Sequence, residues 1–243
     1  MYLIDRLSIV RLSTPKFSFN SNNTYIISRE STTTNYSNLN NITLPIQKTQ
    51  NLNFKIVLIG DISVGKTSIL NRFFKNTFSE NYQSNINANF ISFSIFLDKF
   101  IKVNLNIWDT CGEEKFKSIT KQYYRDASAI LLVYDLTKEN SLKSIENWLN
   151  EIKTTTNESE IFLVGNKNDD EKLFPIKNKE NFTEFVNSFY EVSAKTGNNI
   201  QKMFYNIIEI LAEKSLKEKN FKNINNESLL LDKNKFSKKK KCC

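Results

Sequence analysis

The sequence contains no histidine, few glycines and only three cysteines. Without histidine, the chain has no imidazole to act as a catalytic base or as a metal ligand. No run of about 18 apolar residues occurs, so we expect no membrane-spanning helix. The cysteines are Cys111 and the terminal pair Cys242–Cys243. This is not the pattern of a disulfide framework, and it indicates a reducing compartment.

Glycine accounts for 5 of the 243 residues, where average usage of about 7% predicts roughly 17. A chain so poor in glycine should keep it where the backbone needs a positive φ or approaches a ligand closely. Two of the five glycines fall in one loop, and the others fall in three further motifs. The five are Gly60, Gly65, Gly112, Gly165 and Gly197.

The net charge of +8 is concentrated at one end of the chain. Residues 233–241 carry six lysines and no acidic residue. The excess therefore belongs to a tail and not to a basic face, so we expect no nucleic-acid partner.

The composition divides the chain into three parts. Residues 1–50 are rich in Asn, Ser and Thr and have no sustained periodicity, so we expect a disordered N-terminal extension. The first twelve residues are more apolar and contain two arginines, which leaves a transit peptide or amphipathic anchor open. Residues 51–217 are expected to form one domain, and residues 218–243 a flexible basic tail ending in Cys-Cys.

From residue 52 onward, short apolar runs alternate with helical patterns. Strands are predicted at 54–59, 91–97, 103–107, 129–134 and 161–164, and helices at 66–75, 141–153 and 200–211. A turn at 98–99 joins the second and third strands into an antiparallel hairpin. The pattern predicts an α/β fold with a mostly parallel sheet and a ligand site beyond the carboxyl ends of its strands.

The strand at 54–59 runs into the motif G-x-x-x-x-G-K-T, residues 60–67, which we call the phosphate loop. Inward-pointing backbone N–H groups and the N-terminus of the following helix form a cradle for phosphates. Lys66 reaches the β- and γ-phosphates, and the Thr67 hydroxyl binds Mg²⁺. A chance match is the alternative, and the flanking strand and helix disfavour it. The candidate binding residues are Gly60, Ser63, Val64, Gly65, Lys66, Thr67 and Ser68.

A second motif, WDTCGEE, follows the second strand of the hairpin. An acid at the end of a strand can hold Mg²⁺ through water, which makes Asp109 a candidate metal ligand. Gly112 can offer its N–H to a γ-phosphate. Taken alone, this motif fits an ordinary turn after a strand better than a metal site.

Two further motifs predict guanine recognition. In GNKND, the Asp169 carboxylate can accept hydrogen bonds from guanine N1–H and the 2-amino group, while Asn166 and Lys167 shape the pocket. Adenine cannot supply both donors. In EVSAKTG, which contains Ser193, the Ala194 N–H can contact the guanine carbonyl oxygen and Lys195 can flank the ring. Four motifs in this order disfavour a generic ATPase.

With these motifs and the segments NIWDT, KFKSIT, YYRDA, LVYDLT and the terminal KKKKCC, the chain resembles the Rab family of small GTPases over residues 54–211. The resemblance implies the P-loop GTPase fold, with a mostly parallel six-stranded sheet, one antiparallel edge hairpin and helices on both faces. It implies a switch in vesicle traffic that binds GTP and GDP with Mg²⁺ and hydrolyses GTP. Ala88 and the GNK context resemble the early-endosomal subgroup.

The resemblance also assigns partners and their contact residues. Phe78 matches the aromatic that packs on guanine. Phe90, Trp108 and Tyr123 match the triad that effectors contact, with core packing as the alternative. Cys242 and Cys243 match a double prenylation signal beside the lysines. The implied partners are an exchange factor, an activating protein, effectors and a prenyl-binding escort. The implied location is the cytoplasmic face of endosomal or vesicular membranes, with a cytosolic pool.

Three residues around the expected γ-phosphate depart from the family pattern. Asn85, a candidate ligand of Mg²⁺ and of the nucleotide, replaces a threonine, and Glu113 replaces the glutamine that orients the attacking water. Ile62 occupies a phosphate-loop position that is usually small. Glu113 and Lys66 are the candidate catalytic residues. The departures predict slow hydrolysis, so two hypotheses stay open: a cycling GTPase, and a GTP-locked module that recruits effectors.

Overall fold

The computed structural model describes residues 16–20, 24–28, 49–80, 89–98, 100–110, 122–156, 158–174, 176 and 182–237. The chain divides into two compact units. One comprises Met1–Asn53 and Ser92–Leu105, and the other comprises Phe54–Ile91 and Asn106–Cys243. The domain boundaries expected at residues 50 and 217 stay predictions.

The larger unit is built on parallel strands. Strand β3 (Gln50–Ile59) pairs with β6 (Ala129–Asp135), β6 pairs with β7 (Glu160–Asn166), and β7 pairs with β8 (Ser188–Glu191). Every residue of β6 is buried. A strand buried on both faces reads as a continuous apolar run, which is why the run at 129–134 could be recognised. No residue range was predicted for β8, the sixth strand, because its four residues SFYE form too short a pattern.

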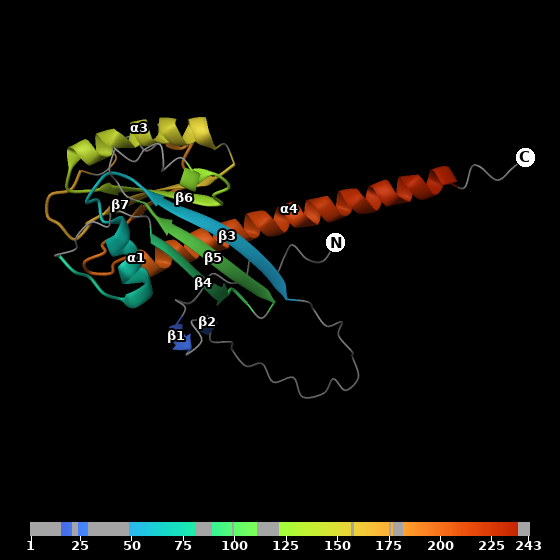
Figure 1. Cartoon of the computed structure of the whole chain (residues 1–243), viewed down its shortest axis with the longest axis horizontal. Helices are drawn as coiled ribbons and strands as arrows, with labels where there is room; N and C mark the ends of the chain where they lie inside the picture. The colour runs from blue at the N-terminus through green and yellow to red at the C-terminus, as the bar shows by residue number, and fades with distance from the viewer. Residues whose placement is uncertain are drawn as a thin grey trace, which may run out of the picture. The chain divides into compact units, whose positions relative to one another are not determined.

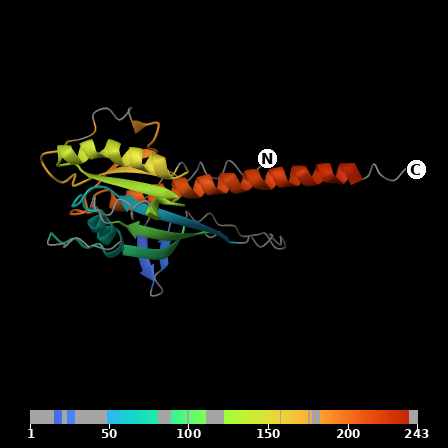
Figure 2. The same ribbon diagram turned by 45° about the horizontal axis from the view of Figure 1, so that its top comes forward.

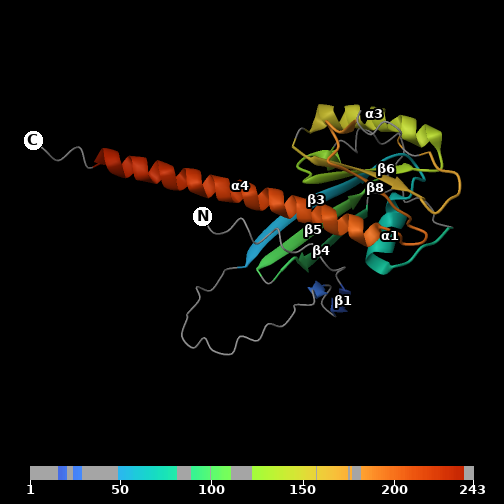
Figure 3. The same ribbon diagram turned by 180° about the vertical axis from the view of Figure 1, so that it is seen from behind.

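Helices cover both faces of these strands. Successive residues of a strand point to opposite faces of the sheet, so an apolar strand such as β6 places side chains on both faces that must be buried. Helix α3 (Glu139–Thr155) lies over β6, where Ile145, Leu149 and Ile152 join a buried cluster with alternate residues of β6 and β7 (Figures 1 and 2). Helices α1 (Lys66–Lys75) and α4 (Ile200–Ser237) lie side by side (Figure 3). The rings of Phe73 and Phe204 stack between them with centroids 4.1 Å apart.

The hairpin has the predicted form. Strand β4 (Asn89–Phe96) turns into β5 (Ile101–Asp109), and the Leu97 N–H donates to the Ile101 carbonyl oxygen at 3.0 Å. The Asp98 carboxylate accepts the N–H groups of Phe100 and Ile101, as aspartate often does in tight turns. The sheet has eight strands. Two of them, described below, precede β4 in the strand order, and the other six, in the order β4-β5-β3-β6-β7-β8, are the strands of the expected sheet. The predicted α/β fold is confirmed.

The smaller unit contains two strands that the sequence analysis did not expect. Strands β1 (Lys16–Asn20) and β2 (Thr24–Ser28) pair antiparallel, and β2 pairs in parallel with β4. The sequence carries a weak signal for them, because KFSFN alternates apolar and polar residues before an Asn-rich link. The remainder of residues 1–48 lies outside the described residues.

Helix α4 confirms the predicted apolar stripe and extends beyond it. The stripe residues are all buried: Ile200, Met203, Phe204, Ile207, Ile208 and Leu211. The helix then continues to Ser237, into the segment that we expected to be a flexible tail. From residue 198 onward the sequence has neither glycine nor proline, so nothing local ends the helix. Within the described ranges, no helix combines the length and apolarity needed to cross a membrane.

Candidate functional site

The phosphate loop connects the end of β3 to the start of α1, and two glycines permit its path. Gly60 has a φ of +136°, and a Cβ atom there would collide with the Val133 carbonyl oxygen of β6. Gly65 has a φ of +99°, and a Cβ atom there would collide with the side-chain amide of Asn166. Both backbone conformation and close packing therefore require glycine at these positions.

Lys66, the first residue of α1, folds back over this loop. Its buried ammonium donates to the carbonyl oxygens of Gly60 and Asp61, each at 2.8 Å. The N-terminus of α1 has no side-chain cap and no acidic residue in its first turn. The first N–H groups of α1 and the Lys66 ammonium thus form a region of positive potential that suits phosphate oxygens.

The other residues of the loop divide into buried and exposed ones. Val64 is buried, whereas Ser63 is exposed and has a positive φ of 62°. The Ile62 side chain is 50% exposed. Asp61 accepts a hydrogen bond at 2.8 Å from the indole N–H of Trp148 on α3. This last contact could not be predicted from the sequence, because no local pattern links residues 87 positions apart.

The predicted metal ligands Thr67 and Asp109 lie together. The Thr67 hydroxyl donates to Asp109 Oδ2 at 2.5 Å. Asp109 is only 4% exposed, and its Oδ1 has no hydrogen-bond partner among the described residues. Burial raises the pKa of this carboxyl, while the Thr67 hydrogen bond and the nearby Lys66 oppose the rise. A buried, unpaired carboxylate oxygen beside a hydroxyl is a donor set that fits Mg²⁺.

Asn166, at the end of β7, joins two loops through one buried side-chain amide. Its Nδ2 donates to the Val64 carbonyl oxygen at 2.9 Å, and its Oδ1 accepts the Ala194 N–H at 3.0 Å. The expectation for Ala194 was a contact with guanine. In the structure its N–H is donated to Asn166, so a guanine oxygen has to share or replace that acceptor.

The predicted guanine reader, Asp169, is held by its neighbour in the last motif. The Ser193 hydroxyl, fully buried, donates to Asp169 Oδ1 at 2.5 Å and accepts the Thr196 N–H at 3.0 Å. Asp169 itself is exposed. Lys195 forms an exposed ion pair with Glu80 at 3.3 Å. Ser193 thus orients a carboxylate that solvent and a base can reach.

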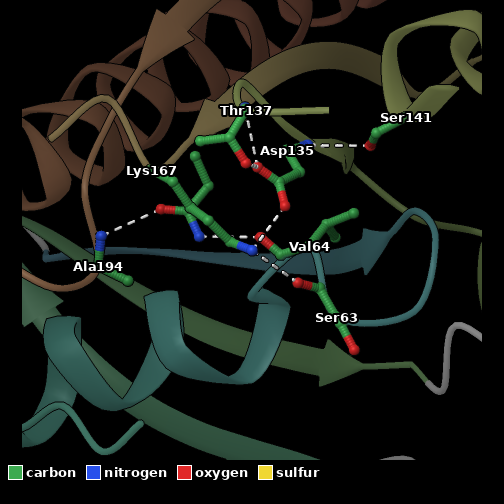
Figure 4. A network of polar contacts seen from close by, with 8 residues as sticks. Ser63, Val64, Asp135, Thr137, Ser141, Lys167 and Ala194 are labelled. Carbon is green, nitrogen blue, oxygen red and sulfur yellow. Dashed lines mark hydrogen bonds and ion pairs between the residues drawn. The ribbon is translucent and has the colours of Figure 1, made fainter. Parts of the chain in front are cut away.

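Lys167 contacts an acid that the sequence analysis did not single out. Its ammonium donates to Asp135 Oδ2 at 2.6 Å and to the Ser63 carbonyl oxygen at 3.1 Å (Figure 4). Asp135 is the last residue of β6. An acid directly after an apolar strand was the available signal, but the segment LVYDLT was interpreted only as part of the family resemblance.

The three aromatic residues of the expected effector triad form one cluster. The rings of Phe90 and Trp108 have centroids 4.9 Å apart, and those of Trp108 and Tyr123 are 5.2 Å apart. Trp108 and Tyr123 pack partly against the buried cluster under α3. The Phe90 side chain is 52% exposed, and the Phe78 side chain is 36% exposed. The core alternative therefore fits Trp108 and Tyr123 better than Phe90.

Several predicted residues lie outside the described part of the chain, and their roles stay predictions. They are Asn85, Ala88, Gly112, Glu113, Cys242 and Cys243.

A family model, described as the Ras family, matches residues 55–213, which is more than half of the chain. The chain belongs to the Ras family. Among similar curated proteins, the Saccharomyces cerevisiae "GTP-binding protein YPT52" is 38% identical over 192 residues, spanning 66% of this chain and 82% of the relative. The "Ras-related protein Rab-10" of Diplobatis ommata is 40% identical over 183 residues, spanning 73% of this chain and 91% of the relative.

A third relative is the "Ras-related protein SEC4" of Candida albicans, 37% identical over 168 residues and spanning 68% of this chain and 80% of the relative. These relatives support the Rab branch of small GTPases within the family. This Rab-type small GTPase is a GTP-binding regulator of vesicle traffic with GTP hydrolase activity.

Proposed function

We propose that this small GTPase binds GTP and GDP with Mg²⁺ through the site described above and hydrolyses GTP slowly. It then spends long periods in the GTP-bound state, in which it recruits effectors. The observation that carries this proposal is a contrast within the site. The phosphate-loop and guanine residues are tied together by hydrogen bonds, whereas three residues assigned to the γ-phosphate depart from the family pattern.

Guanine binding rests on the placement of three loops. Asn166 connects the phosphate loop to Ala194, and Ser193 orients the carboxylate of Asp169. An oriented carboxylate needs little reorganisation to accept both donors of guanine, which favours guanine over adenine. For the metal, Thr67 and Asp109 supply the hydroxyl and the carboxylate. Bound Mg²⁺ would neutralise charge on the phosphates.

Slow hydrolysis rests on the chemistry of three side chains. A glutamine at position 113 would offer an acceptor to the attacking water and a donor to the phosphoryl oxygens, whereas Glu113 keeps only the acceptor and adds negative charge. The amide oxygen of Asn85 could ligate Mg²⁺, but the side chain has a different reach from that of the threonine in the family pattern. Ile62, half exposed in the phosphate loop, occupies space beside the incoming arginine of an activating protein. Such an arginine contributes roughly 10³–10⁵ in rate.

A single-turnover assay on the purified chain tests this proposal. The protein is loaded with GTP and Mg²⁺, and the bound nucleotide is quantified over time, beginning with its content at isolation. We expect guanine nucleotide in the isolated protein and a rate constant at or below the ~10⁻⁴ s⁻¹ of unassisted members. A rate well above that scale contradicts slow hydrolysis. A protein that retains GTP indefinitely favours the GTP-locked alternative.

The second part of the proposal concerns attachment to membranes. Prenyl groups on Cys242 and Cys243 supply two lipid chains, and stable anchoring takes two signals. Each lysine near an anionic surface adds roughly 1 kcal/mol. An exchange factor, an activating protein, effectors and a prenyl-binding escort would then move the protein between endosomal or vesicular membranes and a cytosolic pool.

Fractionation of cells that express variants tests the anchor. Replacing both Cys242 and Cys243 by Ser should make the protein cytosolic, and replacing one should weaken binding. Neutralising Lys238–Lys241 should loosen attachment without abolishing it. Cys111→Ser is the matched control and should leave the distribution unchanged. A double Cys variant that stays on membranes would place the anchor elsewhere, with residues 1–50 as the first candidate.

A further inference from the structure

Lys167 connects three segments that are distant in the sequence. It follows β7, and its ammonium donates to Asp135 Oδ2 at the end of β6 and to the carbonyl oxygen of Ser63 in the phosphate loop. Figure 4 shows the lysine lying between these two acceptors. The position of the lysine over the phosphate loop therefore depends on the anchor at its other side, which is Asp135.

Asp135 is itself held rigidly. It is 1% exposed, and its Oδ1 accepts the N–H of Thr137 at 2.9 Å and the hydroxyl of Thr137 at 2.7 Å. Its own N–H donates to the Ser141 hydroxyl oxygen at 3.0 Å. Burial acts to raise the pKa of Asp135, but the hydrogen bonds from Lys167 and Thr137 outweigh it and hold the pKa below its ordinary value. The carboxylate is thus charged at neutral pH.

The lysine and the phosphate-loop residue that it contacts both have an unusual backbone conformation. Ser63 has a φ of 62° and Lys167 has a φ of 69°. Residues other than glycine adopt this left-handed conformation rarely, and they keep it only where their surroundings hold it. The hydrogen bond from Lys167 to Ser63 joins the two strained residues directly. Loss of the anchor should therefore relax the phosphate loop and the guanine loop together.

We propose that Asp135 is a positioning residue for nucleotide retention. Its carboxylate holds Lys167 across the phosphate loop, so that the loop that reads guanine and the loop that binds phosphates keep one arrangement. A nucleotide contacts both loops and leaves when they separate, so the anchor slows its dissociation. This inference rests on the proposed binding of GTP and GDP, and it adds a residue that touches neither base nor phosphate in that proposal.

The first experiment measures the dissociation rate of a fluorescent GDP analogue from the full chain in Mg²⁺. Asp135→Asn keeps the shape of the side chain and removes the charge. We expect dissociation roughly ten-fold faster, as suits the loss of one partly buried charge-assisted hydrogen bond. Glu139→Gln is the matched control. It makes the same chemical change at an exposed ion pair with Lys143 on α3, and it should leave the rate unchanged.

A double-mutant cycle separates positioning from a general loss of stability. If Asp135 acts through Lys167, then Asp135→Asn should change the rate little once Lys167→Met is present. Rate increases that multiply in the double variant would overturn the proposal. So would a rate for Asp135→Asn equal to that of wild type.

A second variant covers the case in which Asp135→Asn does not fold. Thr137→Val removes one hydrogen bond from the other carboxylate oxygen and leaves the charge, and it should speed dissociation roughly three-fold. An unchanged rate for Thr137→Val would then overturn the proposal. The proposed function fails separately, because in that case the wild-type chain retains no guanine nucleotide at all.

Discussion

The residues proposed to bind guanine (the guanine side) and those proposed to lie near the γ-phosphate (the phosphate side) are held by different kinds of contact. On the guanine side, Asn166, Lys167 and Ser193 each bond to other protein groups. On the phosphate side, Asp109 Oδ1 is buried without a partner among the described residues, and the Ile62 side chain is half exposed. The guanine side is therefore fixed by contacts within the protein, whereas the phosphate side has groups available to a metal, a phosphate or a partner.

This difference separates affinity from rate. Groups already held by the protein lose little entropy when a ligand binds, so the guanine side favours tight and selective binding. Hydrolysis depends on positioning and electrostatics at the γ-phosphate, where single side chains change the rate by large factors. Substitution of Asp169 should therefore change the base preference, and substitution of Glu113 should change the hydrolysis rate.

The largest effect is expected from Lys66→Ala. The buried ammonium is the main positive charge in the phosphate loop, and its loss should weaken GTP and GDP binding by more than roughly 100-fold. Lys75→Ala, at the exposed last turn of the same helix, is the control and should bind normally. Isothermal titration of nucleotide-free protein measures both. Near-normal affinity for Lys66→Ala would contradict the assignment of the phosphate loop.

Asp169→Asn should change which base is bound. An amide cannot accept both guanine donors, so we expect a loss of guanine preference of roughly 100-fold and a gain for xanthine nucleotides. Asp170→Asn, the neighbouring exposed acid, makes the same chemical change and should keep the preference. Competition of GTP, XTP and ATP against bound GDP provides the measurement. Equal displacement by ATP and GTP from wild type would refute guanine recognition.

Glu113→Gln should raise the hydrolysis rate and leave GDP affinity unchanged. The added donor and the removed charge both favour the transition state, and we expect an increase of roughly ten-fold. Adding Asn85→Thr should raise the rate more than additively, because both residues are proposed to act on the same phosphate. Glu114→Gln is the control. A Glu113→Gln rate at or below that of wild type would end the explanation from the missing glutamine.

The smallest effect is expected from Trp148→Phe, which tests whether α3 steadies the phosphate side. The variant loses the hydrogen bond from the indole to Asp61, at a cost of about 1 kcal/mol in the free energy of unfolding. That corresponds to a fall of about 2–4 °C in melting temperature for a domain of this size. Asp61→Asn keeps an acceptor and should change less. A fall several times larger would indicate that Trp148 acts mainly through packing.

Much of the fold and of the site could be predicted because the relevant signals are local. The strand at 54–59, the loop glycines and the helix at 66–75 lie within a span of 22 residues, and the structure has the helix at the predicted bounds. The stripe of α4 was recognisable because a helix repeats its buried face every three or four residues. By contrast, β8 is short, and the helical continuation of α4 beyond the stripe has no periodic apolar face.

The sequence by itself determined which residues are candidates for the chemistry: the phosphate loop with Lys66 and Thr67, the acid Asp109, and the proposed guanine reader Asp169. Such motifs require particular side chains at fixed spacing, so they are visible in one dimension. Only the tertiary structure decided what holds them in place. The contacts of Asp135 with Lys167 and of Trp148 with Asp61 join residues 32 and 87 positions apart. Parallel strands bring their carboxyl ends to one edge, and no local pattern encodes which partners meet there.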